Sequence, residues 1–122
     1  MTNSLFMKGK MGDKQRLLHI LDAINEIENY TANIDIDIFL KNSMMHFASI
    51  KQIEIIGEAA NYISEETKSK FSEIEWRQIT GLRHILVHEY FGVDITLIWQ
   101  IIIDDIPKLK AKIQNIIALT SD

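Results

Sequence analysis

Apolar residues recur at steps of three and four along most of the chain, which is the spacing of amphipathic α-helices. The first such stretch has five aliphatic residues on one side of a helix: Leu17, Ile20, Leu21, Ile24 and Ile27. Asp13 precedes them and belongs to the residue types that cap helix N-termini. The pattern therefore predicts a helix from Asp13 to about Tyr30, preceded by a loose leader over residues 1–12.

A second stretch, from Asp35 or Asp37 to about Ile63, is apolar on several sides. This is typical of a helix in the middle of a bundle. Its second half carries a polar line at spacings of four and three: Glu54, Glu58 and Asn61. Solvent exposure or helix packing explains such a line, and Glu58 and Asn61 are also auxiliary candidates for a functional site.

Residues 64–72 are polar and predict a turn with a short helical piece. Ser72, followed by Glu75, resembles a capping box that opens the next helix. Gly92 fits the C-terminal stop of that helix, and Asp94 fits the cap of a last one.

The last predicted helix has an apolar seam that alternates steps of three and four: Trp99, Ile102, Ile106, Leu109, Ile113 and Ile116. A seam of this kind packs lengthwise against other helices. Pro107 is expected to bend the helix, since proline lacks the backbone N–H of a helical residue. Ile101 and Ile103 fall off the seam, which fits either a subunit interface or a wholly buried helix.

Composition favours one all-α domain over residues 13–122, an up-and-down bundle of four to five helices. The chain has 122 residues, one proline and five glycines, so long helices meet few interruptions. It has no cysteine, which excludes disulfides and thiol nucleophiles and fits a reducing cytoplasm. No apolar run reaches the ~18 residues of a membrane span. The net charge of −4 disfavours a broad nucleic-acid surface and leaves room for a local site.

Most of the reactive side chains gather in residues 81–94, at the end of the third long helix. The pattern is Arg83-x4-His88-x-Tyr90, and His84 lies within it. At 100° per residue, His84 and His88 lie opposite the apolar stripe of this helix. Arg83 is about 140° from His88, so the two are not neighbours on one helix. Arg83 either reaches part of the way or meets His88 of another subunit.

Three interpretations of these residues stay open. The histidines can be idle on a solvent face, with Tyr90 anchoring the helix end. His84 and His88, four apart, can ligate a metal, although Glu89 follows the second histidine instead of lying between the two. Finally, a histidine can move a proton at a ribose oxygen while an arginine stabilises the transition state of phosphodiester cleavage. RNA supplies its own 2′-hydroxyl nucleophile, so this chemistry needs no metal and no cofactor.

Three segments carry a resemblance to a known family: Gly57-Glu58-Ala59-Ala60-Asn61, Trp76-Arg77-Gln78-Ile79 leading into Gly81-Leu82-Arg83, and Arg83-x4-His88-x-Tyr90-Phe91-Gly92-Val93-Asp94. From about Asp13 to its end, the chain resembles HepT-like proteins, the ribonuclease toxins of type VII HEPN–MNT toxin–antitoxin pairs. The third segment is the specific one, and the other two support it.

The resemblance implies an all-α HEPN bundle that forms a homodimer, with the arginine–histidine motifs of both subunits lining one cleft. It implies a metal-independent RNA endonuclease whose candidate catalytic residues are Arg83 and His88. Its expected partner is an MNT-type nucleotidyltransferase antitoxin, which would transfer AMP onto Tyr90. His84 departs from the family, which often has Asn or Asp there, and is an auxiliary candidate. Glu75 stands where the family often has proline, which bears on helix entry.

The mechanism expected from this resemblance uses both subunits. One His88 would deprotonate a ribose 2′-hydroxyl while the second protonates the leaving 5′-oxygen, leaving 2′,3′-cyclic phosphate ends. Two alternatives stay open beside it. The chain can be a non-catalytic α-helical module that binds a nucleotide or RNA, or it can be chiefly a substrate of its nucleotidyltransferase.

Overall fold

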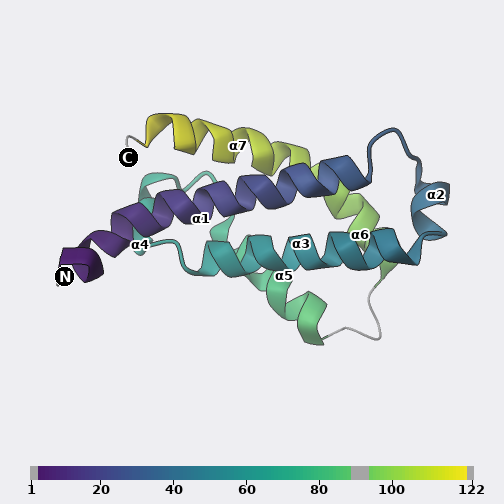
Figure 1. The fold of residues 1–122 in the computed structure, drawn as a ribbon, viewed down its shortest axis with the longest axis horizontal. Helices are drawn as coiled ribbons and strands as arrows, with labels where there is room; N and C mark the ends of the chain where they lie inside the picture. The colour runs from purple at the N-terminus through teal and green to yellow at the C-terminus, as the bar shows by residue number, and fades with distance from the viewer. Residues whose placement is uncertain (1–2, 89–93, 121–122) are drawn as a thin grey trace.

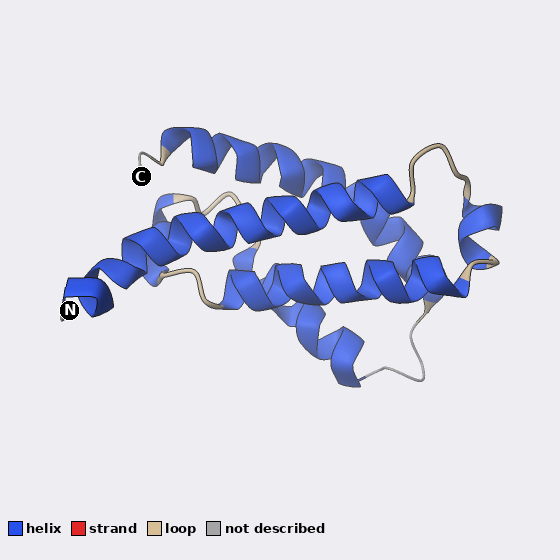
Figure 2. Ribbon diagram, in the orientation of Figure 1, coloured by secondary structure: helices blue, strands red, loops and turns tan. Residues whose placement is uncertain are grey.

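The computed structural model describes residues 3–88 and 94–120, and side chains over residues 12–83 and 94–120. Helices, turns and short loops account for these residues, with no strand among them (Figure 2). The prediction of an all-α helical bundle is confirmed for the described residues. None of the described helices is long and apolar enough to cross a membrane.

Three long helices run lengthwise through the molecule: α1 (Asn3–Tyr30), α3 (Ser43–Asn61) and α7 (Ile106–Leu119). α1 lies between the other two and is antiparallel to both (Figure 1). An ion pair ties α7 to α1, with Lys110 Nζ 2.6 Å from Glu28 Oε1. α1 therefore packs against a helix on each side.

The shorter helices complete the bundle. α5 (Trp76–His88) crosses α3 obliquely, and α4 (Glu65–Lys70) lies near the ends of both α1 and α3 (Figure 1). α2 (Ile36–Leu40) lies at the other end, against α3 and α6 (Ile95–Gln100). A tilted ring contact between Phe39 and Trp99, 5.0 Å between centroids, joins α2 to α6.

The core consists mainly of aliphatic side chains from all the long helices. The positions predicted from the first apolar stretch are buried, with Leu21 only partly so. In α5, Ile79 and Leu82 pack against the core as predicted. Helical periodicity therefore identified the buried faces of α1 and α5 correctly. It did not do so for α3, where Met44 and Phe47 of the apolar pattern are 80% and 56% exposed.

The predicted start of the first helix at Asp13 is wrong. α1 begins at Asn3 and continues through Asp13, which is buried within it. The Asp13 carboxylate accepts hydrogen bonds from Ser64 N–H at 2.9 Å, Ser64 Oγ at 2.6 Å and Thr67 Oγ1 at 2.6 Å. It thus holds the N-terminus of α4 in place of capping its own helix. The single domain predicted over residues 13–122 stays a prediction.

The predicted second helix is in fact two helices. The chain leaves α2 after Leu40, and Asn42 caps α3 by accepting a hydrogen bond from Met45 N–H at 3.0 Å. The His46 ring binds the Phe39 carbonyl across the break. Asparagine is favoured at N-caps because its side chain accepts a hydrogen bond from a backbone N–H that has no acceptor within the helix. Asn42 therefore starts a new helix, although the apolar pattern of the sequence continues across it without a break. Asp35 caps α2, as predicted.

The short helix predicted within residues 64–72 is confirmed as α4, but Ser72 does not open the next helix. α5 begins at Trp76, and Ile79 N–H donates to the Glu75 carbonyl at 3.0 Å. The indole N–H of Trp76 donates to the Phe71 carbonyl at 3.0 Å, which holds the intervening residues in a turn.

The last helix is interrupted by a π-helical segment, Ile101–Asp105, between α6 and α7. Its axis changes direction at this segment, directly before Pro107 (Figure 1). The extra residue of a π turn accommodates a proline that lacks an N–H and clashes with a preceding carbonyl. The turn also brings Ile101 into the core, while Ile103 stays 49% exposed. Asp94 caps α6 as predicted, and Gly92 lies outside the described residues.

We expect Asp13→Ala to lower the free energy of unfolding by about 2–4 kcal/mol, because it removes a buried carboxylate and leaves several donors unpaired. Asp22→Ala, on an exposed position of the same helix, is the matched control and is expected to change it by less than about 0.5 kcal/mol. Urea unfolding of both variants measures the difference. Equal stabilities would contradict the role assigned to Asp13.

Candidate active site

α3 and α5 pack closely at Gly57. A Cβ at this position would lie 3.0 Å from the backbone nitrogen of Arg83 and 3.1 Å from the Ile79 carbonyl oxygen. Both are backbone atoms of a helix, so they cannot move aside as the end of a flexible side chain can. Glycine therefore lets the two helices cross at this distance without a backbone shift.

The next residue, Glu58, pairs with Arg83 across the same crossing. Arg83 Nη1 lies 2.8 Å from Glu58 Oε2, and the two side chains are 24% and 52% exposed. A charge-assisted hydrogen bond of this length is stronger than one between neutral groups, and partial burial of the arginine reduces its screening by solvent. The Gly57–Glu58 pair thus determines both how near Arg83 lies to α3 and where its guanidinium group points.

The other predicted site residues divide into those the structure places and those it does not. Asn61 is the last residue of α3, half-buried and one turn beyond Glu58. His84 and His88 belong to the last turns of α5, but their side chains lie outside the described residues, as does Tyr90 entirely. The structure brings together Glu58 and Arg83, and the functional roles predicted for all of these residues, including these two, stay predictions.

The described residues contain no group of three or more His, Cys, Asp or Glu side chains placed to hold a metal ion. This finding does not include His84 and His88, whose side chains lie outside the part described. The guanidinium of Arg83 is the charged group that this part of the site offers to an anion. An arginine carries five N–H donors in a planar fork, which allows one guanidinium to bind a carboxylate and a phosphate together.

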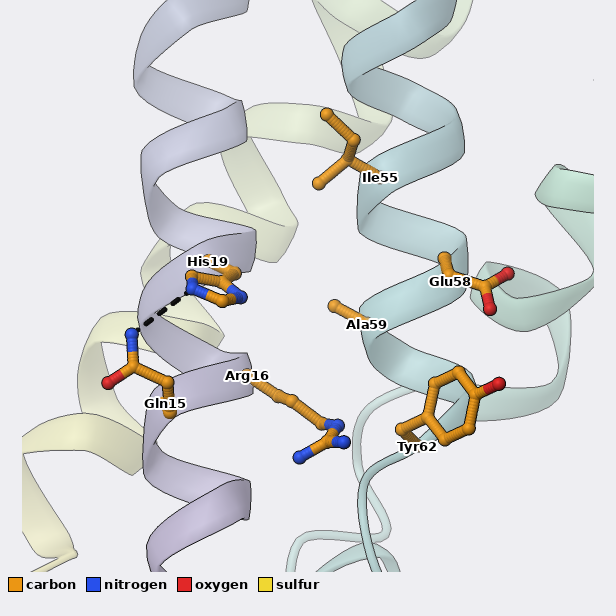
Figure 3. Close-up of a pocket in the computed structure, with 7 residues that line it drawn as sticks. All are labelled: Gln15, Arg16, His19, Ile55, Glu58, Ala59 and Tyr62. Carbon is orange, nitrogen blue, oxygen red and sulfur yellow. Dashed lines mark hydrogen bonds between the residues drawn. The ribbon is translucent and has the colours of Figure 1, made fainter.

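A groove between α1 and α3 adjoins this ion pair and was not predicted from the sequence. Its volume is about 320 Å³, and we call it the α1/α3 groove (Figure 3). Its lining comes from both helices: Gln15, Arg16, His19, Ile55, Glu58, Ala59 and Tyr62. Arg16 points across the groove toward Tyr62, and its Cζ lies 5.3 Å from the centre of the tyrosine ring (Figure 3).

The sequence did contain a signal for this groove. Arg16 and His19 are three residues apart and share the polar side of α1, while Glu58 and Tyr62 are four apart on α3. Each pair alone resembles an ordinary solvent-exposed helix face. Only the packing of α1 on α3 places the two pairs opposite each other.

The helical bundle and the arginine–histidine motif define a class of all-α ribonucleases. The family model for HepT-like ribonucleases matches residues 20–116. The chain therefore belongs to the HepT-like ribonuclease family, which confirms the family indicated by the motif.

Individual relatives agree with this assignment. A Methanocaldococcus jannaschii protein named "Putative RNase MJ1380" is 41% identical over 101 residues, covering 83% of this chain and 93% of that protein. A Thermococcus cleftensis protein named "Probable ribonuclease HepT" is 39% identical over 107 residues, covering 88% and 97%. No solved structure matches the chain significantly.

Two glycine substitutions test the helix crossing. We expect Gly57→Ala to destabilise the protein by about 1–3 kcal/mol, since the added methyl group forces α3 and α5 apart. Gly81→Ala is the matched control because its Cβ would have no atom within 4 Å. It is expected to stabilise α5 by roughly 0.5–1 kcal/mol through helix propensity alone. Urea unfolding measures both changes, and a Gly57→Ala protein as stable as the Gly81→Ala protein would refute the close crossing.

Proposed function

We propose that the chain is a metal-independent endoribonuclease toxin that cleaves RNA at a site built from Arg83 and His88. The observation that carries this proposal is the ion pair between Glu58 of α3 and Arg83 of α5. The helix that carries Arg83 ends at His88. The pair holds a permanently charged guanidinium group at a defined place beside a histidine motif. Arginine suits the stabilisation of a phosphoryl transition state because its charge does not depend on pH.

The geometry of α5 supports a site shared by two subunits. α5 is continuous from Arg83 to His88, so the Cα positions of the two residues differ by about 140° around the helix axis. One helix therefore presents the two residues in different directions. In a homodimer with a two-fold axis beside α5, Arg83 and His88 of both subunits would line one cleft.

Within such a cleft the reaction follows from the chemistry of RNA. One His88 removes the proton of a ribose 2′-hydroxyl, whose oxygen attacks the adjacent phosphorus. The second His88 gives a proton to the departing 5′-oxygen, and the paired Arg83 side chains bind the phosphate oxygens as their charge develops. The products are a 2′,3′-cyclic phosphate and a 5′-hydroxyl. Glu58 pairs with Arg83 and takes no part in the proton transfers, so it acts as a positioning residue for Arg83.

The RNA-cleaving activity would be controlled by modification of Tyr90, two residues after His88. A partner nucleotidyltransferase of the MNT type transfers AMP to the hydroxyl of Tyr90, releasing pyrophosphate from ATP. The new phosphodiester is an anion next to the cleft, where it repels RNA phosphate and competes for the cationic groups. This modification silences the enzyme without unfolding it, and the pair forms a type VII toxin–antitoxin system.

RNA cleavage in the presence of a chelator tests the assignment of the catalytic residues. His88→Ala and Arg83→Ala are each expected to lower the cleavage rate by about 10²–10⁴-fold. Arg77→Gln, an exposed arginine in the first turn of the same helix, is the control and should cleave as wild type. The proposal fails if His88→Ala cleaves at the wild-type rate or if metal is indispensable. RNA that is shifted but never shortened would identify a binding module instead.

Co-expression with an MNT-type nucleotidyltransferase tests the proposed modification. Mass spectrometry is expected to find one added adenylyl group on Tyr90, and the modified protein should no longer cleave RNA. Tyr90→Phe keeps the aromatic ring but has no hydroxyl to modify, so it should stay unmodified and active beside the partner. An unmodified Tyr90, or a modified protein that cleaves RNA at the full rate, would contradict the proposed modification.

A further inference from the structure

The α1/α3 groove has the size and the side chains of a site for one nucleotide. Its volume of about 320 Å³ lies at the lower end of the range for small-ligand sites. Tyr62 is 58% exposed, although its ring is large and aromatic. Nucleobases stack on exposed aromatic rings whatever their identity, because every base has a π face.

Arg16 supplies a positive charge over this ring, with its Cζ 5.3 Å from the ring centre. Its Nη1 donates to the Gly12 carbonyl at 3.3 Å, a neutral acceptor, and none of the ion pairs among the described residues includes Arg16. His19 is exposed on the same side of α1, with its ring 3.1 Å from the amide nitrogen of Gln15. The α1 side of the groove is thus cationic and rich in hydrogen-bonding groups.

Glu58 is the acidic residue of the groove, and Arg83 offsets its charge. Its carboxylate points away from α1 and pairs with Arg83 on the other side of α3 (Figure 3). The same residue therefore lines the groove and positions the proposed catalytic arginine. Glu58 is therefore the side chain that separates a ligand in the groove from Arg83.

We propose that the α1/α3 groove binds a nucleotide of single-stranded RNA that flanks the scissile phosphate. In this subsite the base takes the place of the Arg16 guanidinium over the Tyr62 ring, and Arg16 binds the adjoining phosphate. The inference rests on the proposed ribonuclease function for the identity of its ligand. Because stacking does not distinguish the bases, the subsite favours unpaired RNA over duplex and has little sequence preference.

RNA binding by a protein that cannot cleave tests the subsite separately from catalysis. In a His88→Ala background, fluorescence anisotropy measures the Kd of a short unstructured RNA. Tyr62→Leu and Arg16→Gln are each expected to raise the Kd roughly 5- to 100-fold, the range of losing one stacked base or one phosphate contact. Tyr62→Phe keeps the ring and should bind as the parent protein does. Arg77→Gln, with the same charge change outside the groove, should also bind normally.

Unchanged RNA affinity in both Tyr62→Leu and Arg16→Gln would overturn the subsite. So would tighter binding of free AMP than of RNA, with the same dependence on Tyr62, since the groove would then hold a mononucleotide. Photo-cross-linking of 4-thiouridine RNA to the protein with an intact groove is independent of how the variants fold. It should attach RNA at or beside Tyr62, and attachment only at other helices would count against the proposal.

The two proposals fail in different ways. Wild-type protein that binds RNA through Tyr62 and Arg16 without cleaving it would refute the ribonuclease and support the subsite. Wild-type protein that cleaves RNA, with affinities unchanged in the groove variants, would refute the subsite and support the ribonuclease.

Discussion

The crossing of α3 and α5 at Gly57 is the constraint on which the candidate site depends. A Cβ at this position would lie 3.0–3.1 Å from backbone atoms of Arg83 and Ile79, so any larger residue would force the two helices slightly apart. The neighbouring Glu58 then reaches the guanidinium of Arg83 at 2.8 Å. One short segment of α3 therefore fixes both the distance between the helices and the direction of the arginine. The ion pair is partly buried, which makes its geometry more consequential than that of a fully exposed pair.

α3 also connects the ion pair to the groove on its other side. Glu58 lines the α1/α3 groove while its carboxylate points to α5 (Figure 3). The position of α1 depends in turn on Asp13, whose buried carboxylate binds the N-terminus of α4 just beyond the end of α3. The packing of α1 against α3 thus shapes the groove on one side of α3, while the ion pair with Arg83 lies on the other side.

The sequence predicted the family and most of the buried helix faces, because both depend on short-range patterns. In α3 the apolar pattern also included Met44 and Phe47, which are exposed. Periodicity correctly placed Leu17 and its neighbours in the core. It missed the break at Asn42, since an apolar pattern can continue across a cap that depends on one side-chain hydrogen bond. The motif predicted Arg83, and the polar line of α3 made Glu58 a candidate. Their pairing, like that of Arg16 with Tyr62, joins helices distant in the sequence and follows only from how those helices pack.

The central claim is that Glu58 acts through Arg83, and a double-mutant cycle on the RNA cleavage rate tests it most directly. In chelator and under single-turnover conditions, Glu58→Gln and Arg83→Lys are each expected to slow cleavage by about tenfold or more, since each spoils a charge-assisted contact. Once Arg83→Lys is in place, adding Glu58→Gln should slow the reaction little further. Independent, multiplying effects of the two substitutions, or a Glu58→Gln enzyme that cleaves at the wild-type rate, would contradict the account.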